Sequence, residues 1–180
     1  MARLDYAGSG LPAGPDDEIV ERIRARRGGT LTSLDRMLLH SPPLADGWNS
    51  LMGAVRTAST LPADVRELAI LRVAALNGAD YEWRAHEPLG RAAGLTDADL
   101  TALRGDCDPG TLAPRLSAAL AYTDAMTAHV TVPDEVFAYL REHFDDREVV
   151  ELTVTIGAYN LVSRFLVALH VGDEGERGAA

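Results

Sequence analysis

Lysine is absent from this chain of 180 residues, because all 17 basic residues are arginine. Schiff-base and pyridoxal-phosphate catalysis need a lysine amine, so the chain excludes both. The one cysteine, Cys107, excludes an intrachain disulfide, a redox dithiol and a cysteine-rich zinc site. Cys107 also stands between Asp106 and Asp108, whose charges disfavour the thiolate that a cysteine nucleophile needs.

Membrane and secretion signals are also scarce. No uninterrupted apolar run approaches the roughly 18 residues that cross a bilayer, and the start MARLDYAGSG has no charged-then-apolar leader. We therefore expect no membrane association and predict a cytoplasmic protein. The 17 bases face 27 acids, and the resulting net charge of −10 repels phosphate backbones. Nucleic acid is not expected as a partner.

The composition that remains is globular, with 47% apolar and 24% charged residues. A chain of this length buries roughly 70% of its unfolded surface in one core. We predict a single helical domain over residues 1–180, with a loose segment at 1–14 and a frayed tail at 172–180.

Helical periodicity dominates the sequence, and Pro and Gly punctuate it, so we predict an all-α bundle. Gly28, Gly78 and Gly94 follow helical stretches as stop signals. The expected helices cover residues 15–27, 31–40, 42–58, 61–77, 80–93, a short stretch from 96, 114–128, 133–143 and 147–170.

A weak internal repeat appears at a shift of 84 residues. Val65–His86 laid over Val149–His170 gives five identities in 22 positions, among them Glu67 with Glu151 and His86 with His170. A duplication would produce two related helical pairs about a pseudo-twofold axis. Chance similarity between two amphipathic stretches is the alternative.

Glu67 is the first candidate for chemistry. Its helical neighbours at spacings of three and four are Ala63, Ile70, Leu71 and Ala74. Burial disfavours the charged form of a carboxylate unless a base pairs with it, so Glu67 is a candidate for proton transfer. The structural alternative is a buried ion pair with an arginine such as Arg72 or Arg84.

Glu82 and His86 lie four residues apart on one mostly apolar helix face. Imidazole is the usual proton shuttle near neutral pH. Pro88 deletes a backbone donor just beyond His86, which would bend the helix and could open a cleft. The structural alternative is a core histidine that Glu82 holds across one helical turn.

A metal site is not predicted. Glu82 and His86 have ligand spacing and Glu67 could add an oxygen, but the His-Glu-x-x-His pattern is absent and no second histidine falls at a matching position. Gly-x-Ser-x-Gly elbows and phosphate-binding glycine loops are missing as well. We therefore expect no cofactor.

The stretch from residue 61 to 95 resembles the carboxymuconolactone decarboxylase family, an all-helical superfamily that also contains the alkylhydroperoxidase D proteins. The resemblance is carried by Leu61-Pro62, Arg66-Glu67-Leu68, Asn77, Tyr81-Glu82-Trp83, His86 and Gly94-Leu95. Weaker matches lie upstream, around Trp48, and downstream at Glu151-Leu152, Tyr159-Asn160 and Arg164.

The peroxidase branch of this superfamily has the pattern Glu-x11-Cys-x2-Cys-x3-His. The corresponding positions here are Glu67, Ala79, Glu82 and His86, so both redox sulfurs are missing and dithiol peroxide reduction is excluded. The chain is more similar to the non-redox branch, whose named activity is decarboxylation of a carboxylated unsaturated lactone. The resemblance implies homo-oligomers, as trimers or multiples of them, with the site near a subunit boundary.

Under this resemblance we hypothesise that His86 is the proton donor or oxyanion partner and that Glu67 sets its protonation. Glu82 is the third candidate catalytic residue, and Glu82 or Tyr81 is expected to act as an orienting residue. The residues expected to bind a small-molecule substrate are Tyr81, Arg72 and Arg84, with one of the arginines anchoring its carboxylate. Three functions stay open: a cofactor-free lyase or decarboxylase acting on a small carboxylated lactone or related organic acid, another small-molecule enzyme such as an isomerase, or a catalytically silent helical assembly. The enzymes require Glu67 and His86 to face one solvent-reachable cavity, whereas a silent assembly seals them in an ion pair or spreads them over an interface.

Overall fold

The computed structural model describes residues 2–7, 17–106 and 112–172. Within these ranges every regular element is helical, which confirms the all-α prediction. The elements are α1 (Asp17–Arg27), α2 (Ser33–Leu38), α3 (Pro42–Gly53), the π-helical η1 (Ala54–Ala58), α4 (Ala63–Leu76), α5 (Asp80–Ala92), α6 (Asp97–Thr101), the π-helical η2 (Ala102–Asp106), α7 (Pro114–His129), α8 (Asp134–Arg141) and α9 (Asp146–Leu169). Cys107 and most of the expected loose N-terminal segment and tail lie outside the described residues.

The chain forms two compact units. One comprises the residues up to Ala58 together with those from Leu166 onward, and the other comprises Ser59–Phe165. The expectation of one domain over the whole chain stays a prediction. All the candidate site residues belong to the second unit.

The first unit packs α1 and α2 against α3. Asp35, only 2% exposed, joins two of its parts. Its carboxylate accepts hydrogen bonds from Arg27 Nη2 at 3.0 Å and from the Thr32 backbone N–H at 2.9 Å, and the latter bond completes a capping box at the start of α2.

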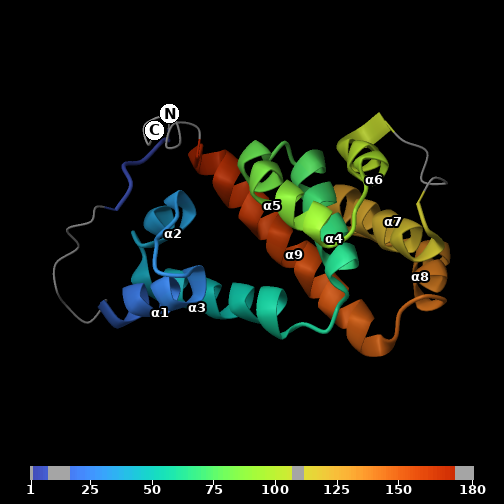
Figure 1. The fold of residues 1–180 in the computed structure, drawn as a ribbon, viewed down its shortest axis with the longest axis horizontal. Coiled ribbons are helices and arrows are strands. Elements are labelled where there is room, and N and C mark those ends of the chain that lie inside the picture. The colour runs from blue at the N-terminus through green and yellow to red at the C-terminus, as the bar shows by residue number, and fades with distance from the viewer. Residues whose placement is uncertain (1, 8–16, 107–111, 173–180) are drawn as a thin grey trace. The chain divides into compact units, whose positions relative to one another are not determined.

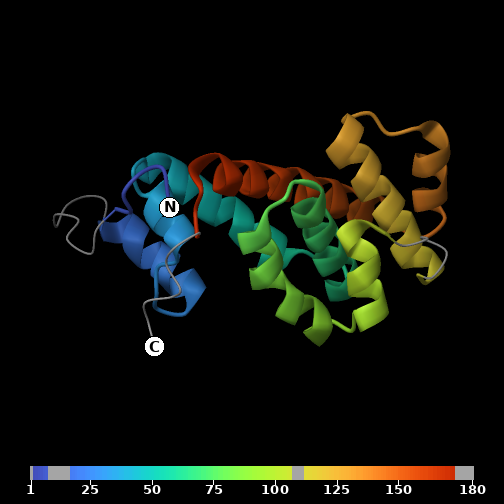
Figure 2. The same ribbon diagram turned by 90° about the horizontal axis from the view of Figure 1, so that it is seen from above.

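Helix α4 is the core of the second unit, where it contacts both α5 and α7 (Figure 1). Its buried residues lie on nearly all sides: Val65, Glu67, Leu68, Ala69, Ile70, Leu71, Val73 and Ala74. A helix that is apolar all round is a core helix. Helices α7 and α8 form a neighbouring pair in the same unit (Figure 2).

A tight turn connects α4 to α5. Gly78 adopts a φ of +62°, a left-handed conformation that glycine adopts without steric cost. The Ala79 N–H then donates to the Ala74 carbonyl oxygen at 2.9 Å, which satisfies one of the last carbonyls of α4. The turn folds α5 back onto α4, and α5 itself continues through Pro88.

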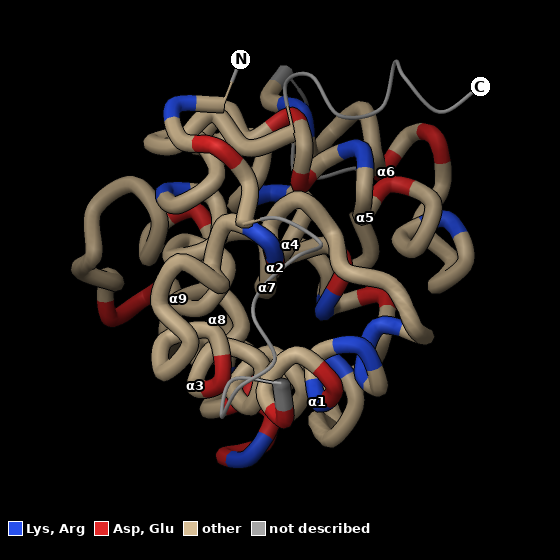
Figure 3. Tube along the Cα trace, turned by 90° about the vertical axis from the view of Figure 1, so that its left-hand side faces the viewer, with Lys and Arg blue, Asp and Glu red and all other residues tan. Residues whose placement is uncertain are grey.

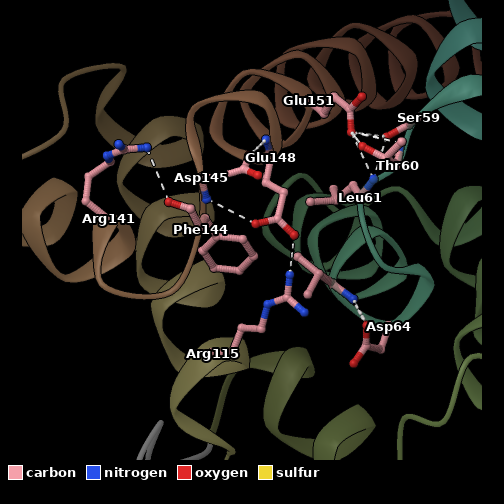
Figure 4. Close-up of polar contacts among 11 residues, drawn as sticks. Ser59, Thr60, Leu61, Asp64, Arg115, Arg141, Phe144, Asp145, Glu148 and Glu151 are labelled. Carbon is pink, nitrogen blue, oxygen red and sulfur yellow. Dashed lines mark hydrogen bonds and ion pairs between the residues drawn. The ribbon is translucent and has the colours of Figure 1, made fainter.

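Helix α9 fixes the chain that leads into α4 (Figure 4). Oε2 of Glu151 accepts hydrogen bonds from the hydroxyls of Ser59 and Thr60, both at 3.0 Å, and from the backbone N–H groups of Thr60 and Leu61, both at 2.9 Å. The N-cap of α4, Pro62, offers no side-chain hydrogen bond. Glu151 therefore holds the entry to α4 from another helix.

The structure does not show the two equivalent helical pairs that the sequence repeat would produce. Val65–His86 forms a helix, a turn and a second helix, whereas residues 149–169 lie within the single helix α9. The reason is local: the position that corresponds to Gly78 is Val162, which continues the helix.

Helix α9 is, among the described residues, long and apolar enough to cross a membrane by length and composition, with a mean hydropathy of 1.5 over its best window. The sequence has no apolar run of this length, because polar residues are interspersed along α9, so only the average over the helix is apolar. Half of that window is buried inside the protein, and core helices of folded proteins meet the same criterion, so it is a weak indication of a membrane span.

Acidic and basic residues are interspersed along the described chain (Figure 3). Many of them form ion pairs, either between helices, as Arg22 does with Asp46, or within one helix, as Arg147 does with Glu151. The acidic excess is therefore not confined to one helix.

Candidate functional site

The structure brings Glu67 and His86 together. Glu67 Oε2 on α4 lies 2.7 Å from His86 Nδ1 on α5, within hydrogen-bond distance. Their side chains are only 5% and 6% exposed, so the pair is almost sealed from solvent, which is the arrangement expected for the silent-assembly alternative. The packing of α5 against α4 creates this contact across 19 residues of sequence.

Tyr159 on α9 extends the pair to a third helix. Its hydroxyl lies 3.2 Å from His86 Nε2, and the two rings meet edge to face, with centroids 5.1 Å apart. An ionised carboxylate only accepts hydrogen bonds, so with Glu67 ionised the Nδ1–H donates to it. Nε2 of a neutral imidazole then accepts from the Tyr159 hydroxyl, whereas Nε2–H of a protonated one donates to it. The resulting chain runs from carboxylate to imidazole to phenol.

Arg66 lies on the other side of Glu67. Its Nε is 3.6 Å from Glu67 Oε1, and its side chain is 18% exposed. Arg66 Nε is buried and has no hydrogen-bond partner among the described residues. Sequence reasoning missed this contact because adjacent residues on a helix do not normally face each other.

Arg72 and Arg84, the two arginines proposed as partners of Glu67, lie elsewhere. Arg72 binds Asp124 through two hydrogen bonds, of 2.6 and 3.0 Å, and donates a third, of 3.0 Å, to the Leu103 carbonyl oxygen. Arg84 is exposed on α5. The ion-pair expectation for these two is therefore wrong, because the packing of α4 directs Arg72 toward α7, and their substrate-binding role stays a prediction.

Glu82 occupies the buried face of α5 without a visible partner. The residue is 2% exposed, and neither carboxyl oxygen has a hydrogen-bond partner among the described residues. Burial raises the pKa of Glu82 to about 9. The alternative in which Glu82 holds His86 is wrong, since both imidazole nitrogens lie against Glu67 and Tyr159.

The remaining predicted site residue, Tyr81, is half-buried in the first turn of α5. Among the described residues no group of three or more His, Cys, Asp and Glu side chains is arranged to hold a metal ion. The chemistry available at this site is therefore that of a carboxylate, an imidazole, a phenol, a guanidinium and a neutral carboxylic acid.

Comparison with known proteins gives the family. The model of the carboxymuconolactone decarboxylase family matches residues 42–125. The uncharacterized protein YdfG of Bacillus subtilis is 30% identical over 115 residues, which cover 62% of this chain and 77% of YdfG. The chain belongs to the carboxymuconolactone decarboxylase family.

Solved structures show the same alkylhydroperoxidase D-like fold. A protein of unknown function from Agrobacterium tumefaciens is 27% identical, with a TM-score of 0.70 over 78% of this chain and 97% of that one. A peroxidase-related protein with an alkylhydroperoxidase AhpD core, from Ralstonia eutropha, is 21% identical, with a TM-score of 0.76 over 96% and 93%. The debrominase Bmp8 is 15% identical, with a TM-score of 0.73 over 96% and 92%, and is also solved with 2,3,4-tribromopyrrole. The scaffold of this carboxymuconolactone decarboxylase family member is thus one that also carries small-molecule enzymes.

Proposed function

We propose that the chain is a cofactor-free, decarboxylase-like lyase that acts on a small carboxylated lactone or a related organic acid. The observation that carries this proposal is the buried 2.7 Å contact between Glu67 and His86, extended by Tyr159. The family membership and the presence of an enzyme among proteins of this fold support it.

The chemistry needs few groups. The bond between the γ-carbon and its carboxylate breaks and releases carbon dioxide, and the electron pair passes through the ring double bond into the lactone carbonyl oxygen. The resulting furanolate then takes one proton on a ring carbon, as the electron pair on oxygen re-forms the lactone carbonyl. Overall, the substrate anion and one proton give the product and carbon dioxide, so the protein must deliver that proton and stabilise a transient oxyanion.

The Glu67–His86–Tyr159 chain suits proton delivery. Glu67 orients the imidazole through its 2.7 Å contact with Nδ1. The phenol hydroxyl or Nε2–H gives its proton to the ring carbon, and solvent restores that proton through the imidazole. General acid catalysis of this kind contributes about 10²- to 10⁴-fold in rate.

Arg66 is the arginine best placed to hold the substrate carboxylate, because its guanidinium adjoins Glu67 and its Nε lacks a hydrogen-bond partner in the described chain. Arg72 would first have to leave Asp124. Tyr81 and Arg84, both near the start of α5, are proposed as secondary substrate contacts.

We also propose a cytoplasmic homo-oligomer, as a trimer or a multiple of one. Exposed apolar side chains on one stripe of α9 support the assembly: Val150 is 61%, Val154 43% and Leu161 51% exposed. A membrane role for α9 is disfavoured because half of its apolar window is already buried within the protein. Light scattering of the purified protein would measure the number of subunits.

The test of function is turnover. Wild-type protein is incubated with carboxylated butenolides and unsaturated dicarboxylates, and carbon dioxide and product are measured. Glu67→Gln and His86→Gln should each lower the rate by about 10²-fold or more, whereas Glu135→Gln, on the exposed part of α8, should not change it. Full turnover in both site variants, or no turnover and no ligand-induced thermal shift in wild type, would overturn the proposal and favour a silent assembly.

A further inference from the structure

We propose that Glu82 is a neutral hydrogen-bond donor to the substrate's carbonyl oxygen, and that it stabilises the negative charge which forms there. The proposal takes the nature of the reacting group from the function proposed above. It names a residue that stabilises the transient oxyanion, a task that was not assigned to the Glu67–His86–Tyr159 chain.

The local backbone explains why Glu82 is available. It is the third residue of α5, a position where a glutamate commonly bends back to bind the N-cap N–H. Here the N-cap residue is Ala79, and its N–H already donates to the Ala74 carbonyl oxygen at 2.9 Å. The Glu82 side chain is buried instead, at 2% exposure.

The Glu82 carboxyl has unused hydrogen-bonding capacity. Both oxygens are buried, and neither has a partner within the described parts of the chain. Burial holds its pKa near 9, so at neutral pH the group carries its proton and presents an O–H donor. Buried polar groups nearly always find partners, so one without a partner in the protein is a candidate to bind a ligand.

The position of Glu82 relative to His86 fits two separate roles, proton delivery by His86 and oxyanion stabilisation by Glu82. Side chains four residues apart share a helix face, with Cβ atoms about 5–6 Å from each other. A small ring bound against this helix face would meet the imidazole at one point and the neutral acid one turn away. An ionised carboxylate would repel the developing oxyanion, whereas a neutral acid donates to it and keeps its own proton.

The partial positive charge at the α5 N-terminus reinforces this arrangement. Side chains on a helix lean toward its N-terminus, so Glu82 leans over the first turn, where the N–H groups have no acceptor inside the helix. Those N–H groups favour negative charge nearby. The first turn of α5 and Glu82 therefore act on the same ligand oxygen in the same sense.

The experiment compares two five-membered lactones by calorimetry. Tetronate carries a delocalised negative oxygen like that of a furanolate, and 2(5H)-furanone is its neutral counterpart. Wild type should bind tetronate at least tenfold more tightly than furanone. Glu82→Gln keeps an N–H donor and should retain most of this preference, whereas Glu82→Leu should lose most of it.

Infrared difference spectra provide a readout that a merely structural role would not change. Wild type at neutral pH should show the carbonyl stretch of a protonated carboxyl group, absent in Glu82→Gln, and tetronate should shift it to lower frequency. A missing or unmoved band, a retained preference in Glu82→Leu, or no binding of either lactone to wild type would overturn the proposal. If Glu82→Leu does not fold, the carbonyl band of wild type and its absence in Glu82→Gln decide whether the proposal holds.

Failure of the two proposals is distinguishable. Loss of tetronate preference in Glu82→Leu alongside full turnover in both Glu67→Gln and His86→Gln would sustain the role of Glu82 and overturn the proton-transfer function. The reverse pattern would overturn the role of Glu82 alone.

Discussion

Helices α5 and α9 each hold a glutamate near their first turns, and the two carboxyl groups differ in charge. Glu82 accepts no hydrogen bond from the described residues, and burial raises its pKa to about 9. At Glu151 burial also raises the pKa, but hydrogen bonds from Arg147, Thr60 and Ser59 outweigh it and lower the pKa to about 2. The number of donors around the carboxylate therefore decides its ionisation.

The same difference separates a structural role from a functional one. Glu151 has its acceptors filled by the chain that enters α4, so its place in the fold accounts for it. The described residues give Glu82 no such partner, so burying its carboxyl group is unfavourable for folding. Sites that keep an unsatisfied polar group are often functional.

The largest expected effect is on the pH dependence of stability. The folded pKa of Glu82, about 9, exceeds its ordinary value of 4.5, so the folded state keeps a proton that the unfolded state has lost. Its contribution to stability is full below pH 4.5 and falls by about 1.4 kcal/mol per pH unit up to about pH 9. Urea unfolding of wild type and Glu82→Gln from pH 5 to 9 should show this slope in wild type only, and parallel curves would contradict it.

Next in size is the removal of Glu151. Glu151→Ala leaves two backbone N–H groups and two hydroxyls without their acceptor, and we expect a loss of about 3 kcal/mol in unfolding free energy at pH 7. Glu151→Gln keeps an oxygen acceptor and should lose less. Because the folded pKa is lowered to about 2, this contribution is full above pH 4.5 and disappears as the pH falls through about 2. Equal stability of the two variants would show that the charge carries the whole effect.

Glu82→Leu is expected to change the unfolding free energy in the opposite direction to Glu151→Ala. Leucine has a similar volume and leaves no buried polar atom, so we expect a gain of about 1–3 kcal/mol at pH 7, measured by chemical unfolding. Glu87→Leu, a control at a half-buried acid on the same helix that does have hydrogen-bond partners, removes an acceptor of Trp83 and Arg91 and should not stabilise. A destabilised Glu82→Leu would reveal a hidden partner of that carboxyl.

Helical periodicity and punctuation predicted the helix order of α4 and α5 and the stop at Gly78, because these features depend on local backbone preferences. They also predicted Glu67 and His86 as candidates, since an ionisable residue on an apolar stripe is visible in sequence. Tyr159 was noticed only as part of a family resemblance. Its contact with His86 joins residues 73 positions apart, which no local pattern specifies.

Two sequence expectations failed for physical reasons. Arg72 was proposed as a partner of Glu67, but the preference of a guanidinium for a bidentate carboxylate is satisfied by Asp124 from α7. The internal repeat failed because similarity in apolar positions does not encode the turn, which needs Gly78. The unsatisfied state of Glu82 depends on the backbone around Ala79 and was beyond any sequence pattern.

The smallest expected change in stability comes from replacing one glycine in α5 and one in α9 by alanine. A Cβ at Gly90 in α5 would lie 2.9 Å from Leu71 Cδ1 and 3.2 Å from Leu95 Cδ1, whereas one at Gly157 in α9 would have nothing within 4 Å. Alanine gains about 1 kcal/mol of helix propensity at either site, but at Gly90 overpacking of buried leucines costs about 1–3 kcal/mol.

Gly90→Ala should therefore lower the melting temperature, and Gly157→Ala should raise that of the dissociated subunit by a few degrees. The rise expected for Gly157→Ala requires that no other subunit covers this face of α9. If another subunit packs closely on Val154 and Leu161, the new methyl group at Gly157 collides with it, and Gly157→Ala then shifts the protein toward smaller species at equal concentration. Melting curves at several protein concentrations separate these outcomes, because only the assembled state gives a concentration-dependent midpoint.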